Sequence, residues 1–349
     1  MTGPATPQTE LMPDEIGLTT TIPVEILLAA GLTPVDLNNV FITDDRRDAL
    51  VARAELDGYP RNVCGWIKGI YAAVLERGIR TVVAVTQGDC SQTHAMIETL
   101  QAQGVDIIPF AYPYDRDRGL LRAQIQRFAE RFGTTWDAAE SQREALLPLR
   151  EQLAEVDRLT WQEGLVTAGE NHLSLVSASD FDGDVEGFSQ RVANLLSEAR
   201  KRQPQQGRVR VGLLGVPPII TDFFPALEAL GAQVVLNEVP RQFAMLPQRD
   251  CDLLEQYARY TYPYDVFGRI ADIQQQVAER RIDGLIHYVQ SFCFRQIEDM
   301  LIKRAVGVPV LTLEGDKPAP LDARNRLRIE AFVETLEARG RRLPPTLPS

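Results

Sequence analysis

A strand-turn-helix signal at residues 81–103 constrains the fold of this chain more than any other stretch. Residues 81–85, Thr-Val-Val-Ala-Val, form an apolar, β-branched run that is typical of a buried strand in a parallel sheet. A Gly-Asp-Cys-Ser turn follows at residues 88–91, and then a helical pattern. We therefore expect Cys90 at the carboxyl end of a strand, where open α/β sheets bind ligands. Amide groups at the helix start favour an anion and lower the pKa of a thiol.

Two further cysteines occupy the same kind of position. Cys64 precedes a helical run at residues 66–76. Cys293 follows a strand-like segment, 284–289, and precedes a helical run at 296–304. Because all three cysteines lie in a loop directly before a helix, we interpret them as three ligands of one iron–sulfur cluster, for which thiolates are suitable ligands.

Residue chemistry alone leaves other interpretations of these cysteines open. A free cysteine often behaves as a small buried hydrophobic residue. Zinc is the rival metal, with His94 or His287 as a fourth ligand, and no local Cys-x-x-Cys identifies either metal. A binding protein with a ligand cleft and a zinc hydrolase therefore stay alternatives. A cubane held by three thiolates would leave one iron open, which by analogy with open zinc sites favours catalysis.

Composition and charge narrow the class of protein. The chain has 349 residues, of which 44% are hydrophobic and 24% charged, as in globular proteins long enough for two domains. Its net charge of −11 argues against binding to nucleic acid or to an anionic membrane. Four cysteines in a chain of this length argue against a disulfide framework. We see no secretory signal and no apolar run of the ~18 residues that a membrane span needs, so we expect a cytoplasmic protein.

Strand and helix signals alternate over most of the chain. This order predicts an α/β fold with two doubly wound parallel-sheet domains of the Rossmann or flavodoxin type. Between residues 119 and 175 only helical spacing appears, which indicates a helical insert between the domains. Strands are expected at 16–20, 35–37, 40–42, 81–85, 105–110, 209–214, 234–236, 282–289 and 308–313. Later helices are expected at 185–201, 217–231, 251–260, 266–280, 296–304 and 322–338, the last with Leu327, Ala331, Phe332 and Leu336 as its apolar face.

The predicted domain boundaries follow from these signals and from a polar stretch at 203–207. We expect a flexible N-terminus at 1–14 and a flexible tail at 341–349. Between them we expect a first α/β domain at 15–118, a helical bridge at 119–206 and a second α/β domain at 207–340.

Five short motifs carry a family resemblance. They are YPRNVC at 59–64, GDCS at 88–91, FC at 292–293, LEGD at 313–316 and LDARNRLRIEAF at 321–332. In this order and spacing they resemble the 2-hydroxyacyl-CoA dehydratase and benzoyl-CoA reductase family, in the type of the dehydratase D component. The resemblance covers about residues 15–338.

The resemblance implies a [4Fe-4S] cluster bound through three cysteines, which in this sequence are Cys64, Cys90 and Cys293. Two of them belong to the first predicted domain and one to the second, so the cluster would lie in the cleft between the domains. The resemblance also implies an ATP-hydrolysing activator protein that delivers a low-potential electron. In the dehydratases this electron converts an acyl-CoA thioester to a ketyl radical, which allows elimination of the 2-hydroxyl group.

Related branches of the family leave the reaction and the assembly open. Reductase relatives reduce a bound ring or another small molecule, and homodimeric double-cubane cluster proteins form a further branch. The expected partner is therefore an identical or a related subunit, and the cofactor is a single cluster or part of a double cubane across the dimer. The sequence has no Gly-x-x-x-x-Gly-Lys-Ser/Thr motif, so nucleotide hydrolysis would belong to the activator.

Two residues are candidates for catalysis. His287, on the strand before Cys293, is either a proton donor near a cluster-bound substrate or a hydrogen-bonded group beneath the site. Glu314 follows another strand, where functional carboxylates lie in this architecture, although Glu314 and Asp316 could also form a structural turn.

The other polar residues near the motifs have structural interpretations. We expect Cys251 to be a bystander thiol, His94 to pack or cap a helix, and His172 to lie on the surface. Arg324, Arg326 and Arg328 are expected on a solvated helix face. Whether the two Tyr-Pro-Tyr turns, at 112–114 and 262–264, shape a pocket is left open by the sequence.

Overall fold

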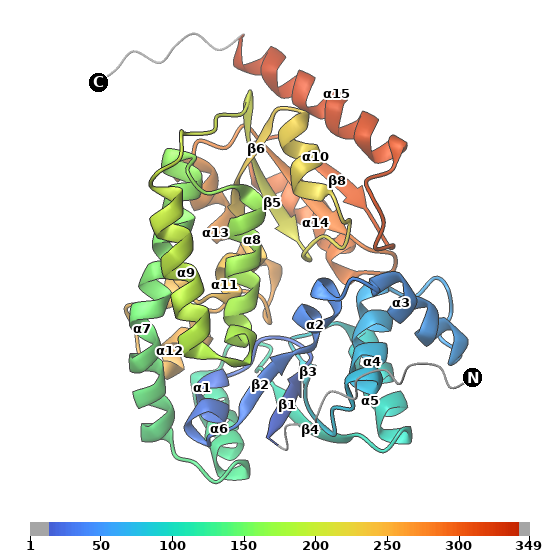
Figure 1. Ribbon diagram of the computed structural model, residues 1–349, viewed down its shortest axis with the longest axis vertical. Coiled ribbons are helices and arrows are strands. Elements are labelled where there is room, and N and C mark those ends of the chain that lie inside the picture. Colours follow the sequence, from blue (N-terminus) through green and yellow to red (C-terminus); the bar gives the residue numbers. More distant parts are fainter. Residues whose placement is uncertain (1–13, 342–349) are drawn as a thin grey trace, which may run out of the picture.

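Two parallel four-stranded sheets form the framework of the protein, and the computed structural model describes residues 14–341. The strand order is β2-β1-β3-β4 in the first sheet and β6-β5-β7-β8 in the second. In Figure 1 the first sheet lies at the bottom and the second at the top. The predicted α/β class with two doubly wound parallel sheets is confirmed. The predicted flexible ends, 1–14 and 341–349, lie outside the described residues except for Asp14 and Arg341.

The helices and strands alternate within each half. The first half contains β1 (Glu15–Leu18), α1 (Val24–Ala29), β2 (Thr33–Asp36), α2 (Leu37–Thr43), α3 (Arg47–Leu56), α4 (Gly65–Arg77), β3 (Thr81–Gln87), α5 (Ser91–Ala102) and β4 (Asp106–Ala111). The second half contains β5 (Val209–Gly215), α10 (Phe223–Ala229), β6 (Ala232–Asn237), α11 (Glu238–Phe243), α12 (Leu253–Arg259), α13 (Val266–Glu279), β7 (Gly284–Val289), α14 (Phe294–Ala305), β8 (Val310–Glu314) and α15 (Ala323–Gly340).

Helices cover both faces of each sheet, as alternation along the strands requires. On β3, Val83 and Val85 belong to the core that also contains residues of α1 and of α6 (Arg118–Arg131), whereas Val82 belongs to the core under α4 and α5. In the second sheet, Leu213 packs in the core with α10 and α15. Leu214 packs on the opposite face, with α13 and α14.

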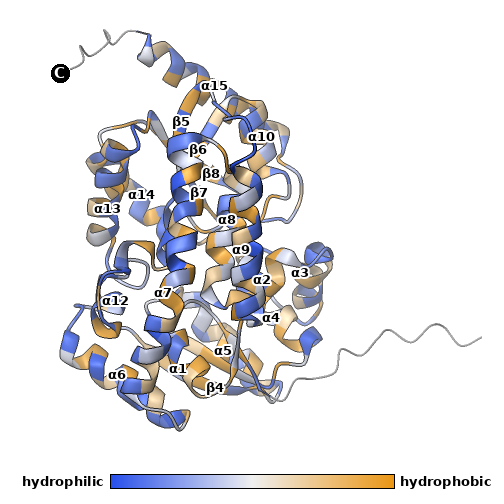
Figure 2. Ribbon diagram, turned by 60° about the vertical axis from the view of Figure 1, so that its left-hand side comes forward, coloured by the Kyte–Doolittle hydropathy of each residue, from blue (hydrophilic) through white to orange (hydrophobic). Residues whose placement is uncertain are grey.

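A helical segment without strands separates the two sheets in the sequence, as predicted. It contains α6 (Arg118–Arg131), α7 (Trp136–Arg158), α8 (Ala168–Val176) and α9 (Val185–Ala199), with a π-helical turn at Leu159–Glu163 and 3-10 turns at Ser177–Ser179 and Phe181–Gly183. The long helices α7 and α9 run beside both sheets in Figure 1. They carry hydrophobic and hydrophilic residues along their length (Figure 2), and their apolar sides share one core with α8. No helix within residues 14–341 is long and apolar enough to cross a bilayer.

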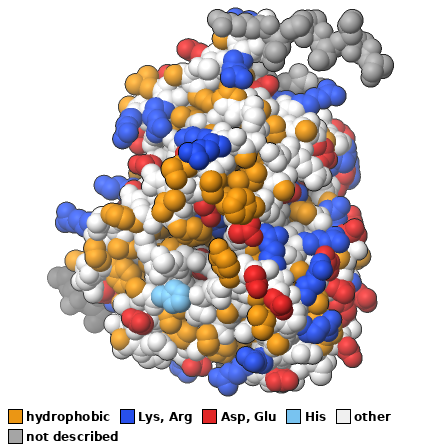
Figure 3. Space-filling view, turned by 180° about the vertical axis from the view of Figure 1, so that it is seen from behind, with side chains coloured by type: hydrophobic (Ala, Val, Ile, Leu, Met, Phe, Trp, Pro, Cys, Tyr) orange, Lys and Arg blue, Asp and Glu red, His pale blue; other side chains and the backbone are white. Residues whose placement is uncertain are grey.

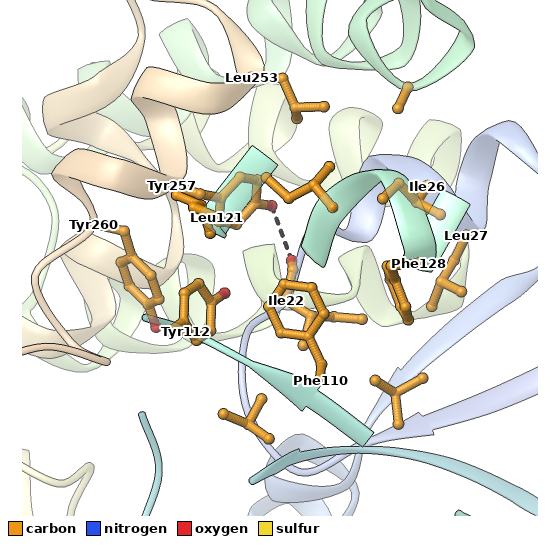
Figure 4. Packing of buried hydrophobic residues seen from close by; sticks show 14 of the residues in the cluster. Ile22, Ile26, Leu27, Phe110, Tyr112, Leu121, Phe128, Leu253, Tyr257 and Tyr260 are labelled. Atoms are coloured by element: carbon orange, nitrogen blue, oxygen red, sulfur yellow. Dashed lines mark hydrogen bonds between the residues drawn. The ribbon is translucent and has the colours of Figure 1, made fainter. Parts of the chain in front are cut away.

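Helix α12 follows β6 in the sequence but packs in the core of the first sheet. Leu253 and Tyr257 of α12 are fully buried there, among Ile22, Phe110 and Leu121 (Figure 4). The Tyr257 hydroxyl lies 2.9 Å from the carbonyl oxygen of Ile22. The second half of the chain thus completes a core that belongs to the first sheet.

The strand predicted at residues 40–42 is wrong, because this segment lies in α2. The Asp36 carboxylate accepts a hydrogen bond from the backbone of Asn38 and so begins a helix directly after β2. Phe41 is then fully buried, with its ring in the space left by Gly69 of α4. Capping and this tertiary contact outweigh the β propensity of the apolar residues.

Two helix details also differ from expectation. The helix predicted to begin at residue 217 begins at Phe223, and the preceding loop contacts the first half of the protein instead. On α15, Leu327 is 65% exposed, although it was assigned to the apolar face. Ile329, Val333 and Leu336 of α15 are buried in the core, and Phe332 packs against it, so the prediction is right for Phe332 and Leu336 and missed Ile329 and Val333.

Charged side chains of both signs cover the surface. Figure 3 shows acidic and basic side chains intermixed over one face of the molecule. The net charge of −11 is therefore not gathered into a single acidic patch on this face.

Candidate functional site

Three helix N-termini meet at one cavity between the two sheets. Cys64, Cys90 and Cys293 are the N-cap residues of α4, α5 and α14, and all three line this cavity. Two of the helices belong to the first half and one to the second, as the sequence predicts for these cysteines. The cavity measures about 70 Å³. Pockets that enclose a whole drug-sized ligand measure ~300–1,000 Å³, so this cavity suits a small group.

The turn that carries Cys90 is held between the two halves of the protein. Gly88 has a φ of 106°, and a Cβ atom at this position would lie 2.7 Å from Pro263. Only glycine combines this backbone conformation with so close a neighbour. The Asp89 carboxylate accepts hydrogen bonds from the backbone of Cys90 (2.7 Å) and from the Thr93 hydroxyl (3.1 Å). The turn is thereby fixed relative to the second half.

The start of α4 is held by the second half in a similar way. Gly65 leaves room for the carbonyl oxygen of Asp316, which would lie 2.6 Å from a Cβ atom there. The indole nitrogen of Trp66 donates to the carbonyl of Pro217 at 3.2 Å. The Cys64 thiol donates to Oε1 of Gln290 at 2.8 Å. Cys64 therefore lies where the two halves contact each other directly.

The loop before Cys293 is fixed by Asp316. Its carboxylate accepts hydrogen bonds from the backbone and the hydroxyl of Ser291, at 2.6 and 2.5 Å. The Leu-Glu-Gly-Asp segment therefore has a structural role, because Asp316 supports the Cys293 loop while its own carbonyl contacts the start of α4. This answers the question that the sequence leaves open for Asp316.

Removal from water dominates the electrostatics of the thiols. Burial raises the pKa of the Cys64 thiol to about 12 and that of Cys90 to about 11. The neighbouring cysteines, and Asp89 beside Cys90, add to the rise, while backbone N–H groups at the helix starts oppose it. The sequence predicts a lowered pKa for the Cys90 thiol, and that prediction is wrong for the protein without a metal because burial outweighs the helix start.

The thiols of Cys64 and Cys90 form hydrogen bonds with other groups and not with each other. Cys64 donates to Gln290, and Sγ of Cys90 accepts from the backbone of Gln92 at 3.3 Å. Within residues 14–341, no group of three or more His, Cys, Asp or Glu side chains is arranged to hold a metal ion. Ligation by the three cysteines stays a prediction.

Within residues 14–341, some buried polar atoms of the residues on the cavity wall have no protein partner. They are Nε2 of Gln290, Nε of Arg295 and Oε1 of Gln92. Gln290 and Arg295 are 0% and 1% exposed, so solvent does not supply the missing partners. Two orphaned donors beside three thiols fit an occupant that accepts hydrogen bonds, as the sulfur atoms of an iron–sulfur cluster do. The donor set is therefore compatible with the predicted cofactor.

The two catalytic candidates do not line the cavity. His287 is fully buried, its Nδ1 lies 2.9 Å from Asp299, and burial lowers its pKa. It is thus a hydrogen-bonded group beneath the site, one of the two alternatives given for it. Glu314 is exposed and accepts a hydrogen bond from the side chain of Gln296. His94, one of the two possible zinc ligands, is exposed on α5 and is absent from the cavity wall.

Other sequence expectations have mixed outcomes. His172 was expected on the surface, and this is wrong: it is 4% exposed, with its ring 4.9 Å from that of Phe224. Burial lowers the pKa of His172 to about 4. The Cys251 thiol donates to the carbonyl of Gln248 and does not line the cavity. Tyr262 does line it, whereas Tyr112 is buried in the first core.

Sequence reasoning missed Asp36, Gln290 and Arg295, which all line the cavity. Asp36 ends β2, and Gln290 directly follows β7. A polar residue at the carboxyl end of a buried parallel strand is a signal that could have found both. Arg295 resembles any other arginine near a helix start, and only the structure shows that its guanidinium is buried between Tyr262 and Phe294.

Fold and site together define a class: an α/β protein of two parallel sheets with a cysteine-lined cavity between them. A family model described as 2-hydroxyglutaryl-CoA dehydratase, D-component, matches residues 19–336. The chain belongs to this family, which confirms the resemblance seen in the motifs and makes it a subunit of the 2-hydroxyacyl-CoA dehydratase type, a class of lyases. Iron–sulfur clusters and an activator partner are known in this family in general. No curated protein matched the chain.

Proposed function

We propose that this chain is the iron–sulfur subunit of a 2-hydroxyacyl-CoA dehydratase-type enzyme, with Cys64, Cys90 and Cys293 as the ligands of a [4Fe-4S] cluster. One observation carries the proposal: three cysteines from both halves of the chain occupy the N-cap positions of three helices around a single cavity. Helix N-termini favour the thiolate form, whereas burial opposes it. A bound metal cluster supplies the positive charge that lets all three cysteines ionise together.

A bound [4Fe-4S] cluster would supply one-electron chemistry and, with three protein ligands, one iron open to a substrate. The chain provides the surroundings. Trp66, Ile67 and Phe243 form apolar parts of the wall and limit the access of water. Gln290 and Arg295 present N–H groups that can hold an acceptor atom of whatever binds there.

We further propose how the reaction is divided between partners. An ATP-hydrolysing activator delivers the low-potential electron, since the sequence contains no phosphate-binding loop of its own. A second subunit, identical or related, completes the enzyme. The substrate is an acyl-CoA whose 2-hydroxyl group leaves as water. The coenzyme part of such a thioester is far larger than the cavity of about 70 Å³ and would extend outside it.

The test is metal analysis of protein purified or reconstituted without oxygen. The wild type is expected to bind about four iron and four sulfide per chain, as a [4Fe-4S] cluster requires. Replacing Cys64, Cys90 or Cys293 by serine should lower the iron content severalfold, because serine is a poor ligand for this cluster. Cys251→Ser is the matched control, since its thiol lies away from the cavity, and its iron content should equal that of the wild type.

Other results would favour the alternatives. Zinc in place of iron, without visible absorbance, would indicate a zinc hydrolase. Ligand binding that survives all three substitutions, in protein without iron, would indicate a non-enzymatic binding protein. A double cubane shared across a dimer would also give about four iron per chain, so reduction of a small molecule without dehydration of an acyl-CoA would indicate the double-cubane reductase.

A further inference from the structure

We propose that Gln290 is a positioning residue that donates a hydrogen bond from its side-chain amide to the Cys64 thiolate and thereby raises the reduction potential of the cluster. This inference rests on the proposed function, and it assigns a role to a residue that the cysteine motifs do not include. Gln290 comes directly after β7 and is 0% exposed, so its amide has only protein atoms and the cavity as neighbours.

The amide of Gln290 is paired on one side only. Its Oε1 accepts from the Cys64 thiol at 2.8 Å and, at the longer distance of 3.4 Å, from the backbone of Trp66. Among residues 14–341, its Nε2 has no partner with good hydrogen-bond geometry, and the Tyr288 hydroxyl is only a weak contact. A buried amide N–H group is costly to leave unpaired. Gln290 therefore carries a buried donor that is available to a new acceptor at this site.

The contact between Gln290 and Cys64 depends on a proton that a metal ligand lacks. As a thiolate, Cys64 has no S–H group, and Oε1 would then face a negatively charged sulfur atom. Rotation of the terminal amide by half a turn exchanges Oε1 with Nε2 and aims an N–H donor at the sulfur. The rotation gives the orphaned donor a charged acceptor. It gives up the long contact to Trp66 and turns Oε1 toward the position that Nε2 leaves.

Hydrogen bonds to the sulfur atoms of a cluster raise its reduction potential, because reduction adds negative charge that the donors stabilise. Nε of Arg295 is a second orphaned donor on the same cavity wall. The other two nitrogens of this guanidinium donate to Glu298 at 3.2 Å and to the carbonyl of Tyr262 at 3.0 Å. Arg295 therefore acts in the same direction as Gln290.

The experiment compares midpoint potentials of the anaerobically loaded protein, measured by a redox titration followed by absorbance and electron paramagnetic resonance. Gln290→Met removes the donor at nearly constant volume, and Gln290→Glu replaces it with a carboxylate of the same shape. Both variants are expected to have a more negative potential than the wild type, with Gln290→Glu the lower of the two. Gln296→Met is the matched control, because this glutamine bonds Glu314 outside the cavity, and its potential should be unchanged.

Each outcome decides the proposal. A potential equal to that of the wild type in either loaded variant overturns it. Loss of cluster uptake in both variants, with metal-free proteins that melt as the wild type does, supports it, because only the donor has changed. A lowered melting temperature of both metal-free variants assigns Gln290 a packing role and overturns it. A wild type that takes up no iron would instead overturn the proposed function itself, which separates the two failures.

Discussion

Asp36 and Asp180 bring two carboxyl groups together inside the protein, and both residues are 4% exposed. The Asp180 carboxylate accepts from the backbone of Asp36 at 2.7 Å, and that of Asp36 accepts from the Ser179 hydroxyl at 2.6 Å. Within residues 14–341 neither carboxylate forms a salt bridge. Burial, together with the charge of Asp36, raises the pKa of Asp180 to about 8. The pair therefore shares a proton at neutral pH.

This pair predicts a pH dependence of stability. An aspartate in the unfolded chain ionises near pH 3.9, whereas folded Asp180 keeps its proton up to about pH 8. Between these values the folded state binds more protons than the unfolded state, so the contribution of the pair to the free energy of unfolding falls as pH rises. Asp180→Asn removes this contribution. Relative to the wild type, the variant should gain at most about 1.4 kcal/mol for each pH unit from 4 to 8, measured by urea unfolding.

Asp250→Asn is the matched control, because the Asp250 side chain is 81% exposed. Its free energy of unfolding should follow that of the wild type at every pH. A constant difference between Asp180→Asn and the wild type across this range would mean that Asp180 is ionised in the folded protein at all these pH values.

At the scale of single elements, the Cys90 turn predicts a contrast between two glycines. Gly88 and Gly104 both have positive φ, but only Gly88 has a close neighbour, since a Cβ atom would lie 2.7 Å from Pro263. Gly104→Ala should cost about 1 kcal/mol of stability through backbone strain alone. Gly88→Ala should cost about 1–3 kcal/mol more, because the added methyl group also crowds Pro263. Chemical denaturation of both variants measures the difference.

The two glycine variants also separate a loss of stability from a loss of iron binding at the cysteine-lined cavity. Because the turn carries Cys90, Gly88→Ala should also reduce iron uptake under the conditions proposed above, whereas Gly104→Ala should not. Equal stability losses in the two variants would show that the loop containing Pro263 moves aside at little cost and does not fix the Cys90 turn.

Many of the individual strands and helices could be predicted from the sequence. Buried parallel strands are long apolar runs, so β3 and β7 and the cysteine loops after them were predicted correctly. Residues 40–42 were not, because local propensity does not contain the space at Gly69 that takes Phe41. The buried face of α15 was predicted only in part: Leu336 is buried as expected, whereas Leu327 is exposed. Apolar residues on two adjoining stripes compete there, and tertiary packing chooses between them.

The candidate site could be predicted only in part. Cys64, Cys90 and Cys293 were found from their common position before a helix, and all three line one cavity. Gln290 and Arg295 were missed because their roles depend on contacts between residues far apart in the sequence. The contact of Gln290 with Cys64, for example, joins residues 226 positions apart. His287 and Glu314 were chosen because they lie at or near strand ends, which does not by itself place a side chain in the cavity.

At the scale of the whole molecule, a buried polar network joins α1, α7 and α12. Arg150 of α7 donates to Glu25 of α1 at 2.6 Å and to Gln256 of α12 at 2.8 Å. The Tyr257 hydroxyl lies 2.7 Å from the Glu25 carboxylate. The network ties the first sheet, the helical segment and the second half of the chain together.

We therefore expect the chain to unfold in a single transition, in spite of its two sheets. Far-ultraviolet circular dichroism and tryptophan fluorescence should report the same midpoint in urea. Tyr257→Phe should lower both midpoints together, with a cost of about 1–3 kcal/mol, because it leaves a buried acceptor without its donor. Tyr114→Phe is the control, since Tyr114 is 74% exposed, and should change neither midpoint. Two separate transitions would contradict the expectation.

The return of α12 to the first sheet has a consequence for how such a protein can change over evolutionary time. Each half of the chain has its own parallel sheet, which suggests two units that could be duplicated, exchanged or encoded by separate genes. Yet residues 15–118 alone would lack Leu253 and Tyr257, and with them part of their own interior. The first half therefore cannot be replaced by that of another protein unless α12 is replaced with it. We expect natural variants to inherit both halves from one ancestor.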